Sequence, residues 1–121
     1  MKDFRQLKVW EKAHALTLEI YKTTVAFPSD ERFRLTSQMR RCSSSIGANI
    51  AEGCGRSSDG DFCRFLEIAM GSVTELDYHL LLARDLGYLK VDGYEFLQPL
   101  VHEVKSMLAP FIRKVSNDRK K

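Results

Sequence analysis

The sequence predicts an all-α protein that folds as an up-down-up-down antiparallel four-helix bundle. Apolar residues recur at a spacing of three to four almost throughout, and only three prolines interrupt the 121 residues. No run alternates apolar and polar residues as a strand does, and no hairpin turn is present. The connections between helical segments are short, which favours antiparallel neighbours. We expect one bundle domain over residues 1–115, followed by a basic tail over residues 116–121 that frays.

Proline and glycine mark the limits of the first two helices. The first is expected over about residues 7–26, because Pro28 disfavours helix in the residue before it. The second is expected to begin near Ser29, where Asp30 and Glu31 suit a positive helix N-terminus, and to end at Gly53. The residues predicted to face the core are Val9, Ala13, Leu16 and Ile20, followed by Leu35, Met39, Cys42, Ile46, Ile50 and Gly53.

The third helix has the clearest start signal in the chain. Ser58 is a favourable N-cap and Asp61 follows three residues later, the spacing of a capping box. The helix is expected to run until Gly87. Its predicted core residues are Phe62, Phe65, Leu66, Ala69, Val73, Leu76, Leu80 and Ala83.

The fourth helix is expected to begin at Asp92, with Glu95 completing a second capping box. Pro99 and Pro110 lie inside the helix, and each is expected to kink it. The predicted core residues are Leu97, either Leu100 or Val101, Val104, Leu108, Phe111 and Val115.

Composition excludes several classes of protein. The chain is 44% hydrophobic and 29% charged, as a globular domain is, and no apolar stretch approaches the ~20 residues that span a bilayer. Residues 1–5 lack the apolar core of a signal peptide, so we expect a cytoplasmic protein with no membrane partner. The three cysteines show no C-x-x-C spacing, which argues against disulfides or a zinc site.

Charge is unevenly distributed along the chain. Residues 1–56 carry ten basic and six acidic groups, residues 57–112 carry four and nine, and residues 113–121 carry five and one. Basic segments therefore flank an acidic middle, although the net charge is only +3. Such asymmetry suits self-association or a polyanionic partner, and it is also compatible with a merely uneven solvated surface.

Small residues form a row on the second helix and recur in the third. A glycine within a helix costs roughly 1 kcal/mol relative to alanine, so two of them call for a compensating reason. Close backbone approach would supply it, either between the second and third helices or between subunits; the alternative is that the glycines are simply tolerated. The residues are Ser44, Gly47, Ala48 and Ala51, and then Ala69, Gly71 and Ser72.

A polar stripe runs beside the small residues. Its spacing places arginine and carboxylate groups of the second helix opposite similar groups of the third, where charge-assisted hydrogen bonds would fix the register. The alternative is a solvent-facing stripe stabilised only by pairs within each helix. We expect an interface or structural polar network formed by Arg41, Ser45, Asn49, Glu52, Ser72 and Glu75.

No catalytic pattern emerges from the sequence. Glu75 and His79 are spaced i,i+4, but a di-metal bundle needs several such pairs and no second one exists. Cys42 follows two arginines, yet its place in the apolar stripe favours core packing over nucleophilic chemistry. The glycines at 53 and 55 end a helix and do not open one after a strand, so they make no phosphate loop. We expect a non-enzyme without cofactor or metal.

Three blocks of this sequence resemble a known family. Residues 4–10, residues 35–56 with Ala-Asn-Ile-Ala-Glu-Gly at 48–53, and residues 69–76 with Gly-Ser-x-x-Glu-Leu at 71–76 are similar to the bacterial four-helix-bundle proteins encoded by intervening sequences in 23S ribosomal RNA genes. Some of these are labelled S23 ribosomal proteins. The resemblance covers about residues 4–112 and implies a homo-oligomer, with a pentameric ring as the expected form. A more distant similarity is to accessory variability determinant proteins of retroelements, which bind nucleic acid and a reverse transcriptase.

Two functions follow as hypotheses. The first is a nucleic-acid-associated adaptor, in which an oligomer repeats weak phosphate contacts and binds RNA or DNA without reading sequence. The alternative is a scaffold that binds a protein partner and no nucleic acid, which the acidic middle of the chain favours. The residues expected to contact phosphate are Arg40, Arg41, Arg56, Arg64, Arg113 and Lys114, together with Arg119, Lys120 and Lys121 of the tail.

Overall fold

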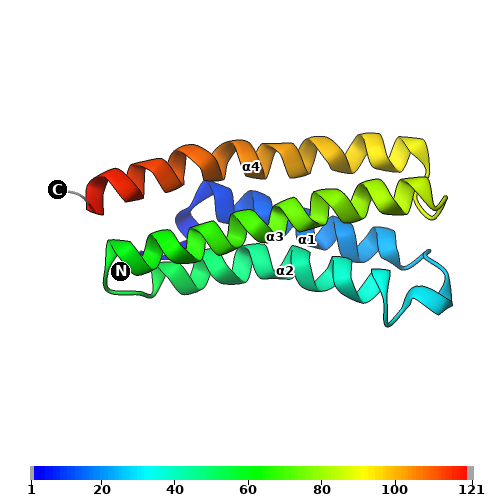
Figure 1. Cartoon of the computed structure of the whole chain (residues 1–121), viewed down its shortest axis with the longest axis horizontal. Coiled ribbons are helices and arrows are strands. Elements are labelled where there is room, and N and C mark those ends of the chain that lie inside the picture. Colours follow the sequence, from blue (N-terminus) through cyan, green and yellow to red (C-terminus); the bar gives the residue numbers. More distant parts are fainter. Residues whose placement is uncertain (1, 120–121) are drawn as a thin grey trace.

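The computed structural model describes residues 2–119, which form four long α-helices running alternately up and down (Figure 1). The prediction of an all-α antiparallel four-helix bundle is confirmed. The long helices are α1 (Lys8–Thr24), α2 (Leu35–Cys54), α3 (Asp59–Asp85) and α4 (Val91–Arg119), and two short 3-10 helices are η1 (Phe4–Gln6) and η2 (Ser29–Glu31). Within the described residues, no helix combines the length and the apolar character needed to cross a lipid bilayer.

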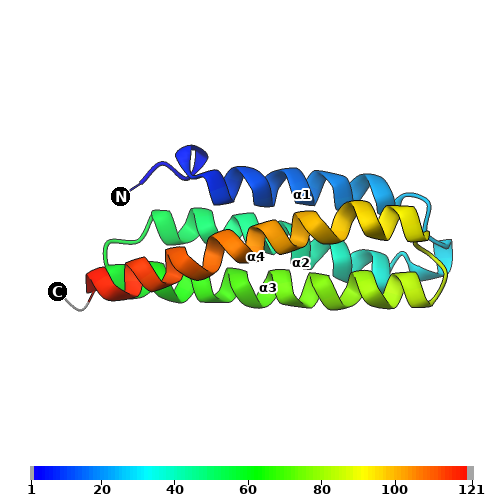
Figure 2. The ribbon, with the colours of Figure 1, turned by 90° about the horizontal axis from the view of Figure 1, so that it is seen from above.

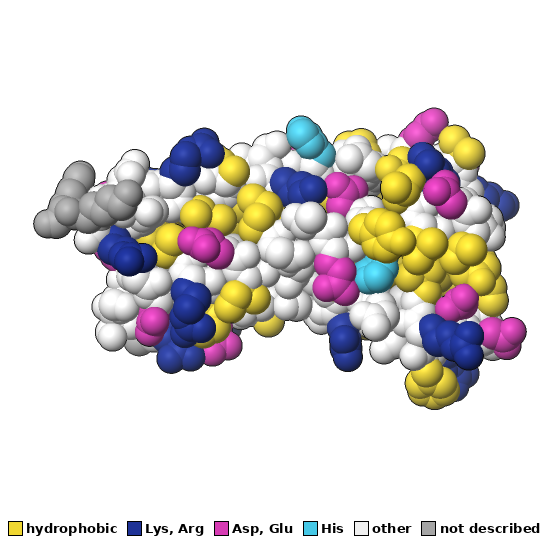
Figure 3. Space-filling view, viewed as in Figure 1, with side chains coloured by type: hydrophobic (Ala, Val, Ile, Leu, Met, Phe, Trp, Pro, Cys, Tyr) yellow, Lys and Arg dark blue, Asp and Glu magenta, His cyan; other side chains and the backbone are white. Residues whose placement is uncertain are grey.

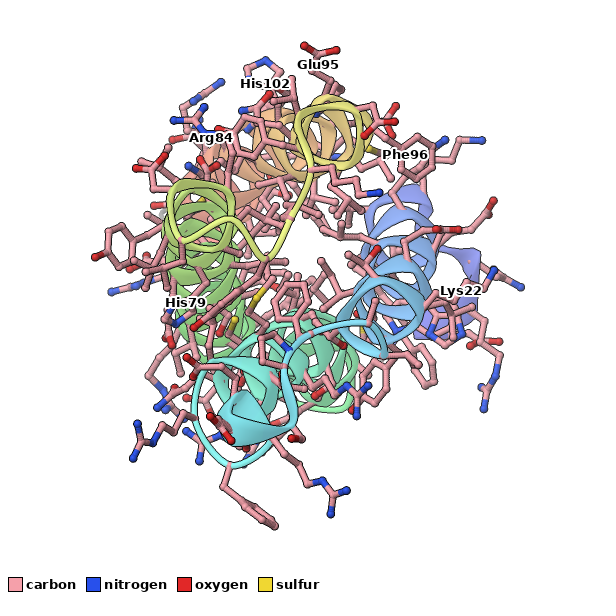
Figure 4. The ribbon with its side chains drawn as sticks, turned by 90° about the vertical axis from the view of Figure 1, so that its right-hand side faces the viewer. Lys22, His79, Arg84, Glu95, Phe96 and His102 are labelled. Atoms are coloured by element: carbon pink, nitrogen blue, oxygen red, sulfur yellow. The ribbon has the colours of Figure 1, made fainter. Side chains whose placement is uncertain are left out.

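The four helices occupy the corners of a square when seen end-on (Figure 4). α1 packs against α2 and α4, and α3 packs against the same two helices. α1 has 17 residues and α4 has 29. The N-terminal end of α1 therefore lies well short of the end of the bundle where α2 connects to α3 (Figure 2). η1 lies there instead, against both α1 and α2. The outer face of α2 near this end is therefore only partly covered.

The core consists of the predicted apolar stripes. Every predicted core residue of α1, α2 and α3 is buried, which confirms the helical period read from the sequence. In α4, Val101 takes the core position and Leu100 lies at its edge, while Phe111 is half-buried against the ring of Phe62. Leu16, Ile46, Leu66 and Leu108 are among the side chains that are almost fully enclosed.

The start of α2 differs from its prediction. Residues 29–31 form the 3-10 turn η2, and α2 begins only at Leu35, because the backbone of Arg34 (φ −123°, ψ −107°) interrupts the helix. Glu31 then caps α2 from a distance, since its carboxylate accepts a hydrogen bond from the Leu35 N–H at 3.3 Å. The same carboxylate accepts the hydroxyl of Tyr88 at 2.8 Å, which ties this turn to the connection between α3 and α4.

The start of α3 and its stop agree with the sequence. Ser58 Oγ accepts a hydrogen bond from the Asp61 N–H at 3.1 Å, so the predicted N-cap is confirmed. After Asp85 the chain turns at Gly87, whose φ of +80° is open to glycine at little cost. This turn lets the N–H groups of Tyr88 and Leu89 donate to the Ala83 carbonyl, which ends the helix.

α4 begins one residue before its prediction and ends later. Its first residue is Val91, and the Asp92 carboxylate accepts from the adjacent Gly93 N–H inside the first turn, where a capping box had been expected. The helix continues through both Pro99 and Pro110 to Arg119. Residues 116–119, which we expect from the sequence to fray, are thus helical. Residues 120 and 121 of the predicted tail lie outside the described residues.

Candidate functional site

An apolar groove of about 470 Å³ runs along the surface between α1 and α2. Its wall on the α1 side is aromatic: Phe4 meets the Trp10 ring edge-on at 4.9 Å, and His14 stacks on Trp10 at 5.0 Å. Deeper between the helices, the Thr17 hydroxyl donates to the Ser43 carbonyl at 2.9 Å. We call this surface the α1–α2 groove; its lining is Phe4, Trp10, His14, Thr17, Leu18, Tyr21, Ser44, Gly47, Ala48 and Ala51.

The row of small residues on α2 is the floor of this groove. A methyl group added at Gly47 would lie 3.3 Å from Trp10 Nε1, so it is the indole of α1, not the backbone of α3, that approaches here. Gly71 on α3 has nothing within 4 Å of the same added atom. The expectation that Gly47 and Gly71 allow α2 and α3 to approach closely within one subunit is therefore wrong. The glycine that admits a close neighbour from α3 is Gly53, where the added atom would lie 2.9 Å from the ring of Phe62.

The opposite side of α2 meets α3 through hydroxyl and amide groups. Ser45 and Ser72 share a hydrogen bond at 3.0 Å, which joins the two helices directly. Asn49 reinforces it, since its side-chain amide donates to the Ser45 carbonyl at 2.8 Å and to the Ser45 hydroxyl at 2.9 Å. We call this junction, with Arg41, Cys42, Glu75 and His79 beside it, the α2–α3 seam. Three of the six predicted network residues are thus brought together inside one subunit.

The two carboxylates of the predicted network, Glu52 and Glu75, pair locally along the chain instead. Glu52 binds Arg56 at 2.8 Å, and Glu75 binds His79 at 3.1 Å, both at i,i+4 spacing. Among residues 2–119, no arginine–carboxylate ion pair joins α2 to α3, so the expected charge-assisted bridge is wrong within the subunit. A partner four residues away along the chain is reached without ordering a second helix, which favours the local pair.

The seam also holds a cluster that sequence reasoning missed. Cys42, Glu75 and His79 place a sulfur, a carboxylate oxygen and an imidazole nitrogen within 4.8 Å of one another. Burial raises the pKa of the Cys42 thiol to about 12, and the nearby Glu75 carboxylate adds to the rise. The i,i+4 pair on α3 was visible in the sequence, but the third donor stands on another helix, 33 residues earlier. Its place in the stripe of α2 that faces α3 was the available signal.

Several predicted phosphate contacts converge at the end of the bundle where α2 meets α3. The guanidinium groups of Arg56 and Arg64 lie over the same Phe65 ring, at 4.8 and 4.6 Å from its centroid. Arg119 packs against Gly60. Phe111 contacts Phe62, which brings the exposed Arg113 and Lys114 of α4 to the same end. We call Arg56, Arg64, Arg113, Lys114 and Arg119 the basic end; Figure 3 shows basic side chains there, interspersed with acidic ones.

Arg40 and Arg41 lie elsewhere. Arg40 donates to the Thr24 hydroxyl at 2.9 Å and its guanidinium covers the Tyr21 ring, so it is engaged with α1. It stands 14 residues before the last residue of α2, or about 21 Å along the helix. Arg41 is exposed at the α2–α3 seam. The six residues predicted to contact nucleic acid therefore do not form one surface, and four of them share the basic end.

Comparison with known protein families identifies the family of this four-helix bundle. A family model described as 23S rRNA-intervening sequence protein matches residues 5–110. The chain belongs to this family. The match includes the α1–α2 groove from Trp10 onward and the whole α2–α3 seam, while Arg113 and Lys114 lie beyond it. The sequence-based resemblance to the 23S intervening-sequence family is confirmed.

A solved structure of the same family supports the assignment. A protein of unknown function from the S23 ribosomal protein family of Bacteroides thetaiotaomicron VPI-5482 is 30% identical to this chain, with a TM-score of 0.78. The similarity covers 86% of this chain and 97% of the other. No curated protein matches the chain. Membership in the 23S rRNA-intervening sequence family thus accounts for the bundle, and the chemistry of its surfaces has to be argued from this chain.

Proposed function

We propose that this protein is a non-catalytic homo-oligomer, with a pentamer as the expected form, that acts in the cytoplasm as an adaptor on RNA or DNA. The observation that carries the proposal is the basic end. There, side chains from the connection after α2, the first turns of α3 and the last turns of α4 gather at one end of the bundle. Guanidinium and ammonium groups bind phosphate without reading bases, so the binding is expected to be independent of sequence.

The carboxylates at this end compete with phosphate for the arginines but do not prevent phosphate binding. Arg56 pairs with Glu52, and Arg64 with Asp61 at 3.8 Å, but all four side chains are between 42% and 58% exposed. Ion pairs this exposed are worth about 0–1 kcal/mol, so a phosphate competes with them. One subunit with a net charge of +3 would bind weakly. An oligomer that presents several basic ends to one strand would multiply these contacts.

The α1–α2 groove supports self-association. Its floor of serine, glycine and alanine allows another helix to approach closely, and its aromatic wall offers apolar area to bury. Trp10 and Tyr21 are residue types that dominate the energy of protein interfaces. A second copy of the chain, contributing a helix to the groove, is the occupant we propose.

A pair of charge-reversed double variants tests the nucleic-acid part of the proposal. Arg56→Glu with Arg64→Glu changes the basic end, and Arg32→Glu with Arg34→Glu makes the same change in charge at the opposite end, where both arginines are exposed. Binding to a labelled RNA hairpin and to a DNA duplex is followed by fluorescence anisotropy. We expect at least about tenfold weaker binding for the first variant and little change for the second. Equal losses, or none in either, would show that the basic end is not the site.

A protein partner is the second candidate, and the same groove favours it. If light scattering finds a monomer and no nucleic acid binds, the aromatic wall and small-residue floor are left for a helix of another protein. A homo-oligomer that binds nucleic acid through the basic end contradicts this alternative.

A further inference from the structure

The sulfur, oxygen and nitrogen of the α2–α3 seam point to a metal ion. Cys42 approaches from α2, and Glu75 and His79 approach from successive turns of α3, with their donor atoms within 4.8 Å of one another. In Figure 4, His79 lies on the part of α3 that is next to α2. We propose that Cys42, Glu75 and His79 form a binding site for a transition-metal ion, with Zn²⁺ preferred, that links α2 to α3. This proposal is independent of nucleic-acid binding.

The imidazole is not satisfied by the protein alone. The His79 side chain is 15% exposed, and its Nε2 lies 3.1 Å from the Glu75 carboxylate. Its Nδ1 is buried and has no hydrogen-bond partner among the described residues. A buried polar atom without a partner costs free energy, and coordination of a cation through Nδ1 would satisfy it. In an exposed i,i+4 pair on a helix surface, water would hydrogen-bond to the second ring nitrogen, so no polar atom would lack a partner.

The donor set selects the kind of ion. Thiolate and imidazole are poor ligands for Mg²⁺ and Ca²⁺, which bind oxygen, whereas Zn²⁺ accepts sulfur, nitrogen and carboxylate oxygen together. With a thiolate, a carboxylate and a neutral imidazole, the charges of the ligands cancel that of Zn²⁺. Arg41 is the further charged group beside the cluster, and because it is exposed, water screens it from the ion.

The geometry needs only a small adjustment. Ligand atoms of tetrahedral zinc lie about 3.3–3.8 Å apart, given bonds of roughly 2.0–2.3 Å. Atoms now within 4.8 Å would have to close by about 1 Å, and the Glu75 side chain, 50% exposed, is free to supply the movement. The hollow beside the cluster has a volume of about 170 Å³ and is lined by Arg41, Cys42, Ser45, Ser72 and Glu75. It leaves room for a water as the fourth ligand.

Cobalt and zinc titrations of the reduced, chelator-treated full chain test the site. Co²⁺ bound to a thiolate gives a charge-transfer absorption in the near ultraviolet, and Zn²⁺ should displace it with one ion per chain. We expect Cys42→Ser to abolish this absorption. We expect Cys42→Ser and His79→Gln each to weaken Zn²⁺ binding by at least about tenfold, and Glu75→Gln to weaken it less.

Cys63→Ser is the matched control. Cys63 is also buried, and its thiol donates to the Glu67 carboxylate one turn away at 3.4 Å, but it belongs to no such three-donor cluster among the described residues. We expect this variant to bind Co²⁺ and Zn²⁺ as the unchanged chain does. If Cys42→Ser fails to fold, His79→Gln decides, since this residue lies at the edge of the core. Absence of a one-to-one complex, or a thiolate absorption that survives Cys42→Ser or disappears in Cys63→Ser, would overturn the proposal.

Discussion

The two sides of α2 contact their neighbours in different ways. Toward α1, the helix presents the small residues of the groove floor, and the space above them stays open between aromatic side chains. Toward α3, Ser45 and Asn49 close their hydrogen bonds with Ser72 inside the subunit. The comparison shows that small residues on one helix serve unlike purposes: at Gly47 they shape an outer surface, and at Gly53 they admit a phenylalanine into the core. The groove is therefore the side of α2 that offers an open apolar surface for the assembly we propose.

Among the variants considered, a charge placed in the α1–α2 groove should have the largest effect, because it would disrupt assembly through this side of α2. Ala48→Glu adds a carboxylate to the exposed floor, and an unpaired charge buried in an interface costs about 3–5 kcal/mol. We expect the proposed homo-oligomer to dissociate, seen by light scattering, while the separated subunit stays folded. Ala15→Glu is the control, because Ala15 is exposed on α1 outside the groove lining. If Ala48→Glu and Ala15→Glu assembled equally well, the groove would not be part of the subunit interface.

Filling the close contact at Gly53 should have the next largest effect. The added methyl of Gly53→Ala would lie 2.9 Å from the Phe62 ring and 3.1 Å from Phe65 Cβ, and overpacking of this kind costs about 1–3 kcal/mol. We expect the free energy of unfolding, measured by urea denaturation, to fall by that amount. Gly71→Ala is the matched control, because its methyl enters open space and alanine favours the helix by up to about 1 kcal/mol. A stabilised Gly53→Ala would contradict the packing of α2 on α3 described above.

Removing the hydroxyl at the centre of the seam should have a smaller effect. Ser45→Ala deletes the hydrogen bond to Ser72 and one of the two bonds from Asn49, and each net bond contributes about 1 kcal/mol, offset in part by the helix preference of alanine. We expect a loss of about 1 kcal/mol in urea denaturation and no change in assembly. Ser44→Ala removes a hydroxyl that donates to the Arg41 carbonyl of its own helix at 3.1 Å, and it is expected to be nearly neutral in stability. A Ser45→Ala variant that dissociates the oligomer would place the seam between subunits.

The fold could be predicted from the sequence because the bundle core repeats with the helical period. The stripe from Val9 to Ile20 depends only on local spacing, and the cap at Ser58 is also local. The start of α2 could not be predicted as well, because acidic residues at 30 and 31 suit both a 3-10 turn and an α-helical N-terminus. The backbone of Arg34, which decides between them, leaves no signature in residue type.

The candidate sites were less predictable because they depend on which elements meet. Small residues on α2 were evident, but their direction depends on Trp10, which comes from another helix. The serine pair across the seam was expected, whereas the local pairing of Glu52 with Arg56 shows that spacing alone does not choose between neighbours. The cluster of Cys42, Glu75 and His79 depends on α2 lying beside α3, which residue spacing alone does not predict.

The adaptor that we propose is an oligomer that binds nucleic acid through repeated basic ends. The most direct test measures the affinity of the assembled protein for an RNA hairpin and a DNA duplex across a series of salt concentrations. The slope of log affinity against log salt is about −0.9 for each phosphate neutralised on duplex DNA. We predict a slope that corresponds to several phosphates and that becomes shallower for Arg56→Glu with Arg64→Glu. No binding at low salt, or a slope near zero, would contradict nucleic-acid binding by the basic end and favour a protein partner in the α1–α2 groove.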